Sequence, residues 1–331
     1  MRRIDPAGII TTYAGGGTTP GSAADGGPAT SAQLKNVYTV ALDPAGHLIV
    51  GTVPGLRRVD RTTRVISTIA EPGLLYGLLV DPRGAFYYTD ATYGNLFKLT
   101  AGQEPVIFAG GGSFVGDGRA ANAAILHSPQ GLALDAAGNL YIADSFNKLV
   151  RRVSAANGTI STIAGRIDGA YAPPQEGNDA AGAVVGFPRD LDFDAAGNLY
   201  ISDLLNGRVW RITTDGKIRT YAGGGAPSDD VGDNGPATSA RIYPIGIALD
   251  REGNLFIADS DAYETVPHHR IRRVDARTGI ITTIAGSSAR GGTGDGAPAT
   301  LPATTLALAP TAVSAAVNGC CEFSTENDAA S

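Results

Sequence analysis

Asp190 and Asp192 stand two residues apart in the run FPRDLDFD, directly after Arg189. In an extended strand, side chains at alternate positions share a face and lie about 7 Å apart. Two carboxylates at that separation raise each other's pKa or attract a cation such as Ca²⁺. The pair predicts a site for a metal ion or a polar ligand. The alternative is that the two carboxylates bind nothing and face water in an open channel of the fold.

Further polar and aromatic residues precede similar runs elsewhere in the chain. Together with Arg189 they are Tyr38, Tyr76, His127, Gln130 and Tyr243. An arginine, a histidine and three tyrosines around one cavity can bind a carboxylate or a sugar-like ligand. In an enzyme, His127 or Tyr243 would be the acid–base group. The alternative is structural, because aromatic residues beside proline, as in Tyr243-Pro244, also fill the core between sheets.

A third group of candidate residues lies in the segment DSDAYETVPHHRIRRVD. It contains Asp261, Glu264, His268 and His269. Histidines together with carboxylates can bind a divalent metal. Adjacent histidines in a strand point to opposite faces, however, and the segment has neither HxH nor HExxH spacing.

All three groups lie within an internal repeat. Each unit has a run ending in a shared aspartate, a turn with glycine such as AAGN, and three more runs such as LYIAD, VRRVS and TISTIAG. The shared residues are Asp43, Asp81, Asp135, Asp194 and Asp250. Four short β-branched or aromatic runs bounded by Gly, Asp and Asn predict four antiparallel strands, which make one blade of a propeller. Five complete blades are predicted, at residues 35–70, 74–110, 124–165, 184–224 and 238–286.

The two chain ends supply the strands of one more blade. ATTLALAPTAVSAAV (303–317) matches the first two runs in degraded form, and the segment 2–14 matches the third and fourth. Pairing of the ends closes a ring and removes the last exposed sheet edge. We therefore expect an all-β fold, a six-bladed propeller of four-stranded antiparallel blades over residues 1–317, followed by a flexible tail over 318–331.

The repeat HSPQGLALDAAGNLYIADSFNKLVRRVSAANGTISTIAG resembles the NHL repeat, and the linkers DGGPATSAQL, DGRAANAAIL and DNGPATSARI resemble those of bacterial NHL arrays. The resemblance covers residues 2–310 and implies a propeller, a fold that hosts binding modules and several enzyme classes. Six-bladed relatives include lactonases, with channel Ca²⁺ held by Glu, Asn and Asp, and peptidyl-hydroxyglycine lyases, with zinc held by three His. This chain has one His at the expected channel mouth and no inner-strand Glu or Asn.

The repeat also assigns structural roles. Counting back from the shared aspartate, the first and third residues are expected in the core, and the second and fourth along the channel. Asp90, Asp144, Asp203 and Asp259 are expected to cap turns, because each blade needs a turn whereas a site is needed once. The arginine doublets Arg57-Arg58, Arg151-Arg152 and Arg272-Arg273 are expected to pair with neighbouring acids or to lie exposed between blades. The linkers should crowd the face where the first strands begin, and the short connection 70–76 should leave a lower rim there.

The composition of the chain bears on which binding partners are expected. The net charge is −6 without a basic stripe, so nucleic acid is not expected, and no apolar run is long enough to insert into a membrane. The N-terminus shows no secretion signal, and an extracytoplasmic location would require a leader that has been removed. Cys320 and Cys321 are adjacent, which strains a mutual disulfide, and two thiols make no zinc site.

The sequence favours a monomeric scaffold that binds a small polar ligand or a protein through its loop-rich channel-mouth face. Two alternatives stay open. One is a Ca- or Zn-dependent hydrolase, lactonase or lyase with its site in the channel, and the other is an extracellular sensor or adhesion domain.

Overall fold

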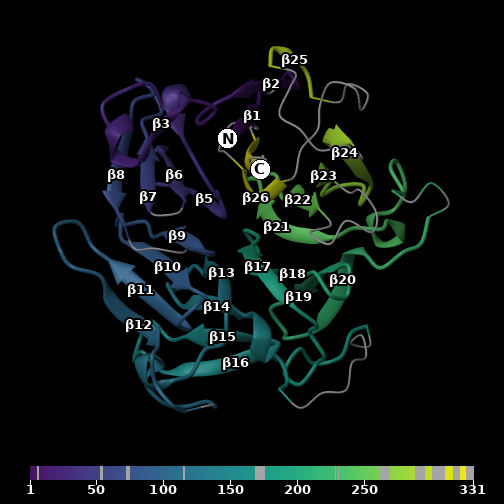
Figure 1. The fold of residues 1–331 in the computed structure, drawn as a ribbon. Coiled ribbons are helices and arrows are strands. Elements are labelled where there is room, and N and C mark those ends of the chain that lie inside the picture. The colour runs from purple at the N-terminus through teal and green to yellow at the C-terminus, as the bar shows by residue number, and fades with distance from the viewer. Residues whose placement is uncertain are drawn as a thin grey trace. The chain divides into compact units, whose positions relative to one another are not determined.

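The computed structural model describes residues 1–5, 7–52, 55–71, 75–114, 116–167, 176–227, 229, 231–260, 269–287, 295–299, 310–315 and 321–325. The chain forms two compact units. The first unit comprises Met1–Leu75, Asp233–Pro236 and Ile245–Ser331, and the second comprises Tyr76–Gly232 and Ala237–Pro244. Figure 1 labels the strands of both units.

The second unit holds three four-stranded antiparallel sheets, which we call blades 2, 3 and 4. Blade 2 is β9 (Leu78–Val80), β10 (Phe86–Asp90), β11 (Asn95–Leu99) and β12 (Val106–Gly110). Blade 3 is β13 (Pro129–Leu134), β14 (Leu140–Asp144), β15 (Leu149–Val153) and β16 (Ile160–Gly165). Blade 4 is β17 (Pro188–Phe193), β18 (Leu199–Asp203), β19 (Arg208–Ile212) and β20 (Ile218–Gly223). In each, the strands pair in chain order.

The first unit holds two further sheets of this kind. Blade 1 is β5 (Thr39–Leu42), β6 (Leu48–Gly51), β7 (Leu56–Val59) and β8 (Ile66–Ala70). Blade 5 is β21 (Pro244–Leu249), β22 (Leu255–Ser260), β23 (His269–Val274) and β24 (Ile281–Ser287). The short parallel pair β3 (Thr19–Pro20) and β4 (Ala32–Gln33) and the 3-10 turns η1 (Gly21–Ala24) and η2 (Ala29–Ser31) precede blade 1. The 3-10 turns η3 (Ala121–Ala123), η4 (Ser145–Asn147) and η5 (Ala237–Ser239) belong to the second unit.

The turn between the first and second strands of a blade is held by the shared aspartate and a glycine. The Oδ1 atom of Asp135 accepts hydrogen bonds from the backbone N–H groups of Ala137 and Asn139, at 3.0 and 2.9 Å. Gly138 within this turn has a φ of +79°, which favours glycine. Asp43, Asp81 and Asp194 accept from the same relative positions in blades 1, 2 and 4, and Asp250 of blade 5 accepts from the N–H of Asn254 at 2.7 Å. The prediction that the shared aspartate is a turn residue is confirmed.

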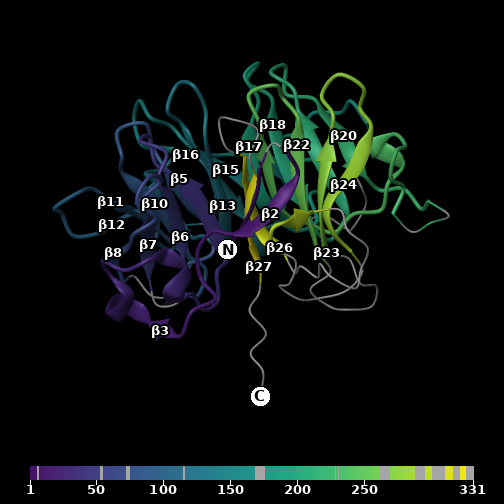
Figure 2. The same cartoon turned by 90° about the horizontal axis from the view of Figure 1, so that it is seen from above.

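A terminal sheet joins both chain ends. Its strand order is β25 (Ala297–Pro298), β2 (Ile9–Thr12), β1 (Arg2–Ile4), β27 (Cys321–Thr325) and β26 (Pro310–Ala315). Arg2 is the Cα partner of Phe323 in this sheet, and β27 lies beside the N-terminus in Figure 2.

The terminal sheet corrects the expected strand positions. Cys321–Thr325 is a strand, although residues 318–331 were expected to form a flexible tail, and β26 occupies Pro310–Ala315. The expectation placed two strands in 303–317 because their apolar runs match the repeat. Residues 303–309 lie outside the described residues.

The first strands also depart from the expected split between core and channel. Ala133 of β13 belongs to one apolar cluster with Leu191 and Trp210 of blade 4. Its neighbour Leu132 belongs to a different cluster, with Leu96 of blade 2. Alternate side chains of the strand thus face the two neighbouring sheets, because stacked sheets cover both faces of every strand. For these residues the assignment of alternate positions to a channel was wrong.

The linkers lie along the outer strands instead of crowding the face where the first strands begin. Gly26, Gly118, Gly177, Asn234 and Gly296 each donate a backbone N–H to the carbonyl of an outer-strand residue, at 2.8 to 3.0 Å. These acceptors are Ile66, Ile160, Ile218, Ile281 and Ile10. The described connection before β9 contributes no such contact to β12.

Acids of these linkers also reach the third strands of blades 1, 3 and 5. Arg57 pairs with Asp25 at 2.7 Å, Arg151 with Asp117 at 3.1 Å and Arg272 with Asp233 at 2.7 Å. Arg2 of the terminal sheet pairs with Asp295 at 2.8 Å. Of the two roles expected for the doublets, pairing with an acid is the one that Arg57, Arg151 and Arg272 have.

Candidate functional site

One edge of the second unit collects the connections where chemistry or recognition is possible. Antiparallel pairing brings the turns after β10, β14 and β18 to the same edge as the segments that enter β13 and β17. We call this edge the loop face. It comprises residues 91–95, 124–128, 145–149, 166–167, 184–187 and 204–207.

Buried acids hold the turns of the loop face in place. Asp144 and Asp203 are fully buried. Asp144 accepts the backbone N–H of His127 at 2.7 Å and the side-chain amide of Asn147 at 2.9 Å. Asp203 accepts the backbone N–H groups of Gly186 and Phe187, each at 2.8 Å. The prediction that these acids cap loops is confirmed.

Opposing effects act on the pKa of the Asp144 carboxyl group. Burial raises the pKa of its carboxyl group. The hydrogen bonds from His127 and Asn147 and the nearby Arg151 guanidinium, at 3.7 Å, act in the opposite direction and favour the charged form. Because its oxygens face inward, Asp144 organises the loop instead of presenting a charge to a ligand.

Above these caps, four side chains from three connections stack in a row. The imidazole of His127 stacks on Phe146 with ring centroids 5.1 Å apart, and Phe146 meets Phe187 edge to face at 5.3 Å. The guanidinium of Arg189 lies 6.0 Å from the Phe187 ring, within range of a cation–π interaction. The predicted residues His127 and Arg189 are therefore linked through two phenylalanines that the sequence analysis did not select.

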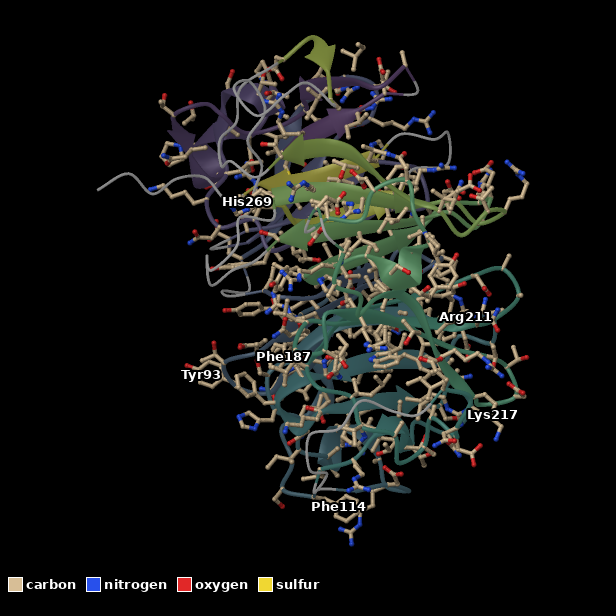
Figure 3. All side chains as sticks on the ribbon, turned by 90° about the vertical axis from the view of Figure 1, so that its right-hand side faces the viewer. Tyr93, Phe114, Phe187, Arg211, Lys217 and His269 are labelled. Atoms are coloured by element: carbon tan, nitrogen blue, oxygen red, sulfur yellow. The ribbon has the colours of Figure 1, made fainter. Side chains whose placement is uncertain are left out.

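Two neighbouring turns continue the row. A Cβ on Gly186 would lie 3.0 Å from the Cβ of Leu205, so the Leu205 turn packs against the segment that carries Phe187. A Cβ on Gly94 would lie 2.3 Å from the Leu126 carbonyl, so the Tyr93 turn packs against the segment that carries His127. We call His127, Phe146, Phe187 and Leu205 the aromatic platform, with Tyr93 and Arg189 at its margin. Figure 3 shows Tyr93 and Phe187 on one side of the second unit and Lys217 on the other.

The apolar side chains here are exposed to solvent. Tyr93 is 78% exposed, Phe146 57% and Leu205 55%. Of the seven exposed large apolar residues among those described, five lie on the loop face: Tyr93, Ile125, Phe146, Ile167 and Leu205. A group of large apolar side chains on one face is typical of a binding surface, whereas single ones are ordinary.

Asp190 and Asp192 are half-buried on β17, below this row. Each accepts a hydrogen bond from the next backbone N–H, Leu191 at 3.0 Å and Phe193 at 2.8 Å. Gly131 explains why Asp190 fits, because a Cβ there would fall 2.5 Å from both the Cα and the Oδ1 of Asp190. The Asp190 carboxylate therefore lies close to the backbone of β13, and both carboxylates bond to the backbone of β17.

The predicted metal ligands do not form a three-ligand cluster among the described residues. Among the described residues, no three His, Cys, Asp or Glu side chains come together in a way that could hold a metal ion. Asp261, Glu264 and His268 lie outside the described residues. His269 is buried in β23, and its Nδ1 lies 3.4 Å from the hydroxyl of Ser260.

The remaining predicted ligand residues are dispersed. Gln130 is 5% exposed, and its carbonyl accepts the Thr89 hydroxyl at 3.2 Å, so it lies beneath the surface. Tyr76 and Tyr243 are half-buried in the second unit. Tyr38 belongs to the first unit, where its N–H donates to Gly51. Within the predicted set, ring contacts through Phe146 and Phe187 connect His127 with Arg189.

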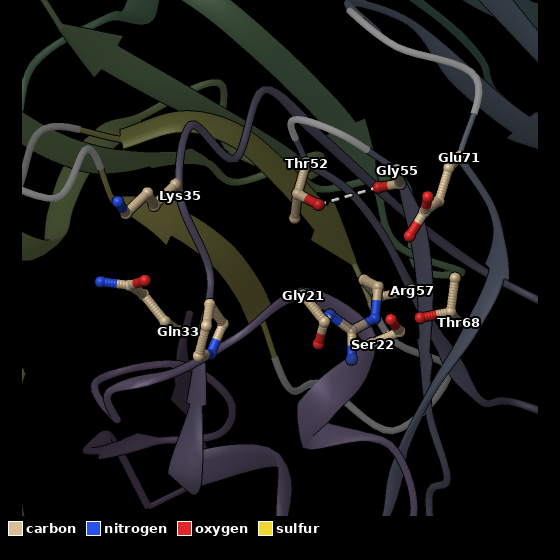
Figure 4. Close-up of a pocket in the computed structure, with 10 residues that line it drawn as sticks. Gly21, Ser22, Gln33, Lys35, Thr52, Gly55, Arg57, Thr68 and Glu71 are labelled. Carbon is tan, nitrogen blue, oxygen red and sulfur yellow. Dashed lines mark hydrogen bonds between the residues drawn. The ribbon is translucent and has the colours of Figure 1, made fainter.

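A separate cavity of about 130 Å³ lies in the first unit. Figure 4 shows Gln33 and Lys35 on one side of it and Arg57, Thr68 and Glu71 on the other. Its most buried polar groups are already engaged: Arg57 holds Asp25, and the Thr52 hydroxyl donates to the Gly55 carbonyl at 2.8 Å. The loop face is therefore the stronger candidate site.

Comparison with known proteins places the fold in a family. A family model described as the teneurin NHL domain matches residues 102–226. Human teneurin-1 is 27% identical over 310 residues, which is 84% of this chain and 11% of the teneurin. The chain is an NHL-repeat β-propeller. It spans about a tenth of the length of the teneurins that it matches.

Solved structures show the same architecture at low sequence identity. A Bacteroides thetaiotaomicron protein of unknown function matches this NHL propeller with a TM-score of 0.65 and 18% identity, covering 93% of this chain and 72% of that one. A chain from a nidogen/laminin complex gives a TM-score of 0.56 and 17% identity, covering 84% and 85%. Virginiamycin B lyase from Staphylococcus aureus gives 0.51 and 14%, covering 87% and 77%. These likenesses show an all-β propeller of four-stranded antiparallel blades.

No helix among the described residues is both long and apolar enough to cross a membrane.

Proposed function

We propose that this NHL propeller is a protein-binding module and that the loop face of its second unit is the binding surface. The single observation that carries the proposal is the aromatic platform, in which exposed Phe146 joins His127 and Phe187 by ring contacts. The turns do not need apolar residues at these positions, because Asp144 and Asp203 already satisfy the local backbone.

The chemistry of the platform indicates the kind of contact. Interfaces draw most of their binding energy from a few aromatic, arginine and similar anchors that exclude water. Rings already stacked on one another lose little conformational freedom on binding. A peptide segment or loop with apolar side chains would bury Phe146 and Leu205 while its backbone bonds to polar groups at the margin.

A comparison with solved structures also supports this proposal. One structural neighbour was solved within a nidogen/laminin complex. That likeness concerns the fold, and the binding residues proposed here come from this chain's own turns.

We also propose that the terminal sheet is the sixth blade of the propeller and closes its ring. The pairing of β1 with β27, Arg2 with Phe323 and Ile4 with Cys321, supports it. Deleting residues 2–14 would leave the edge of β27 unpaired, so this variant should aggregate or melt at a much lower temperature. An unchanged melting curve would contradict closure by these strands.

The binding proposal is tested by selecting a phage-displayed library of random twelve-residue peptides on the purified protein. We expect enriched sequences with apolar side chains, and we expect Phe146→Ser/Leu205→Ser to lose the binding of those peptides by at least about tenfold. Arg211→Gln is the matched control, because it lies on β19 away from the loop face. Enriched peptides that bind the platform variant as well as the wild type would sink the proposal.

A further inference from the structure

A second surface is exposed because blade 2 lacks the linker that covers its sister blades. In the order β9-β10-β11-β12, the strand β12 is the outer edge, and Figure 1 shows it farthest from β9 within that sheet. No described segment outside the blade donates a backbone hydrogen bond to Pro105 or Ile107, or accepts one from them.

The covered blades show what sits at this position. In blade 1, the linker carboxylate of Asp25 accepts from Arg57, from the Thr68 hydroxyl at 3.2 Å and from the Thr68 N–H at 3.0 Å. Blade 3 repeats the arrangement, with Asp117 bonded to Arg151 and to the Thr162 hydroxyl. An arginine and a threonine that are cross-strand Cα partners thus hold one linker acid.

Blade 2 differs at both of these positions. Phe97 stands where blades 1 and 3 have arginine, and its Cα partner Ile107 stands where they have threonine. Phe97 is half-buried against Tyr88, with ring centroids 5.3 Å apart. Ile107 is 42% exposed and the adjacent Val106 58%. The arginine charge and the threonine hydroxyl are therefore both replaced by apolar side chains.

The residues at the start of the outer strands differ between the blades that have a linker and blade 2. Ile66, Ile160, Ile218 and Ile281 are fully buried beneath their linkers. The equivalent residue of blade 2 is Pro105, which has no N–H to donate. Proline at a sheet edge limits indiscriminate strand pairing. The carbonyl of Pro105 and the backbone of Ile107 are the groups left for a selective contact.

We propose that the outer edge of blade 2 binds an extended peptide segment of a partner protein, which lies where the linkers lie in the other blades and carries an apolar side chain where they carry an acid. The apolar side chains at this edge favour a segment with an apolar side chain over one with an acid. A linker acid is stabilised by arginine and threonine, and it would lose both partners beside Phe97 and Ile107. Short segments added at a sheet edge combine backbone hydrogen bonds with side-chain pockets in this way. The proposal does not depend on the loop face.

The chain itself supplies the probe. A ten-residue peptide with the sequence of residues 233–242, DNGPATSARI, is compared with its Asp233→Leu form. Fluorescence anisotropy with labelled peptides, up to about 1 mM protein, measures the dissociation constants. On the wild type, the Leu form should bind at least about tenfold more tightly than the Asp form.

A double variant of the protein gives blade 2 the arginine and threonine of blades 1 and 3. Phe97→Arg/Ile107→Thr introduces the residues that blades 1 and 3 have at these positions, and it should reverse the preference, so that the Asp form binds about tenfold more tightly. Ile107→Thr alone should weaken binding of the Leu form and keeps the test valid if the double variant does not fold. Arg211→Gln should leave both affinities unchanged.

Three results would overturn the proposal. They are an absence of binding by the Leu form, the same preference in wild type and double variant, and concentration-dependent dimerisation that Ile107→Thr abolishes in light scattering. The last result would make a second copy of the chain the occupant.

Discussion

The carboxylate of Asp25 lies 2.7 Å from the guanidinium of Arg57, although 32 residues separate the two in sequence. The same relationship recurs between Asp117 and Arg151 and between Asp233 and Arg272. Each pair fastens a linker to the third strand of the blade that follows it. The linkers are thus part of the blades, and a blade without one has a different outer surface.

Removing one member of such a pair should be costly. Arg272→Met removes the guanidinium that lies 3.1 Å from the fully buried carboxylate of Asp259. We expect the free energy of unfolding to fall by about 3 to 5 kcal/mol, because an uncompensated charge stays buried. Urea denaturation measures the change. Arg273→Met is the control, since Arg273 pairs with Asp275 at the surface, and it should leave the midpoint unchanged. Equal effects of the two variants would contradict this role.

Asp60 should make stability depend on acid pH. Hydrogen bonds from the backbone N–H of Thr63, then of Thr62, lower its pKa from 3.8 to about 2. Because the folded pKa lies below the unfolded one, its contribution is complete above about pH 4 and is lost as pH falls through 2. Asp60→Ala should therefore lower the urea midpoint at pH 6 and make little difference near pH 2. A difference of the same size at both pH values would show that the carboxylate's charge is irrelevant.

Gly131 should not tolerate a side chain. The added Cβ of Gly131→Ala would meet the Cα and Oδ1 of Asp190 at 2.5 Å, and backbone cannot move as a flexible side chain can. We expect a loss of about 1 to 3 kcal/mol in the free energy of unfolding, as for other overpacked sites. Gly27→Ala, whose nearest contact would be at 3.3 Å, is the matched control for thermal denaturation. An unaffected melting temperature for Gly131→Ala would mean that β13 and β17 are less tightly packed.

The uncovered edge of blade 2 should exchange its amide hydrogens faster than a covered edge. In β20, the N–H of Ile218 donates to Asn178 and that of Thr220 donates to Glu176. Hydrogen exchange followed by mass spectrometry should show lower protection for a peptide over 105–110 than for one over 218–223. Equal protection of both peptides would contradict the absence of a cover.

The blades were predictable from sequence because their signals are local. Each shared aspartate, such as Asp135, bonds to backbone within four residues, and this chemistry recurs in every repeat. The linker pairs could be expected only in part, since sequence shows that Arg151 needs an acid but not that Asp117 supplies it. Cys321–Thr325 was missed because its match to the repeat is weak.

The candidate site was less predictable because it depends on tertiary contacts. His127 and Arg189 were selected by residue type, whereas Phe146 and Leu205 were passed over as ordinary turn residues. The available signal was a large apolar residue in a turn whose aspartate already provides the cap, as in DSFN and DLLN. Asp190 and Asp192 attracted attention by their charge, yet their carboxylates bond to the adjacent backbone N–H groups.

The most direct test of the account maps a selected peptide onto the protein. Hydrogen exchange is measured with and without a peptide taken from the library selection. Binding at the aromatic platform predicts increased protection in 124–128, 145–149, 184–187 and 204–207, and its loss in Phe146→Ser/Leu205→Ser. Protection confined to other segments, or retained in that variant, would contradict the central claim that this NHL propeller binds proteins through the loop face.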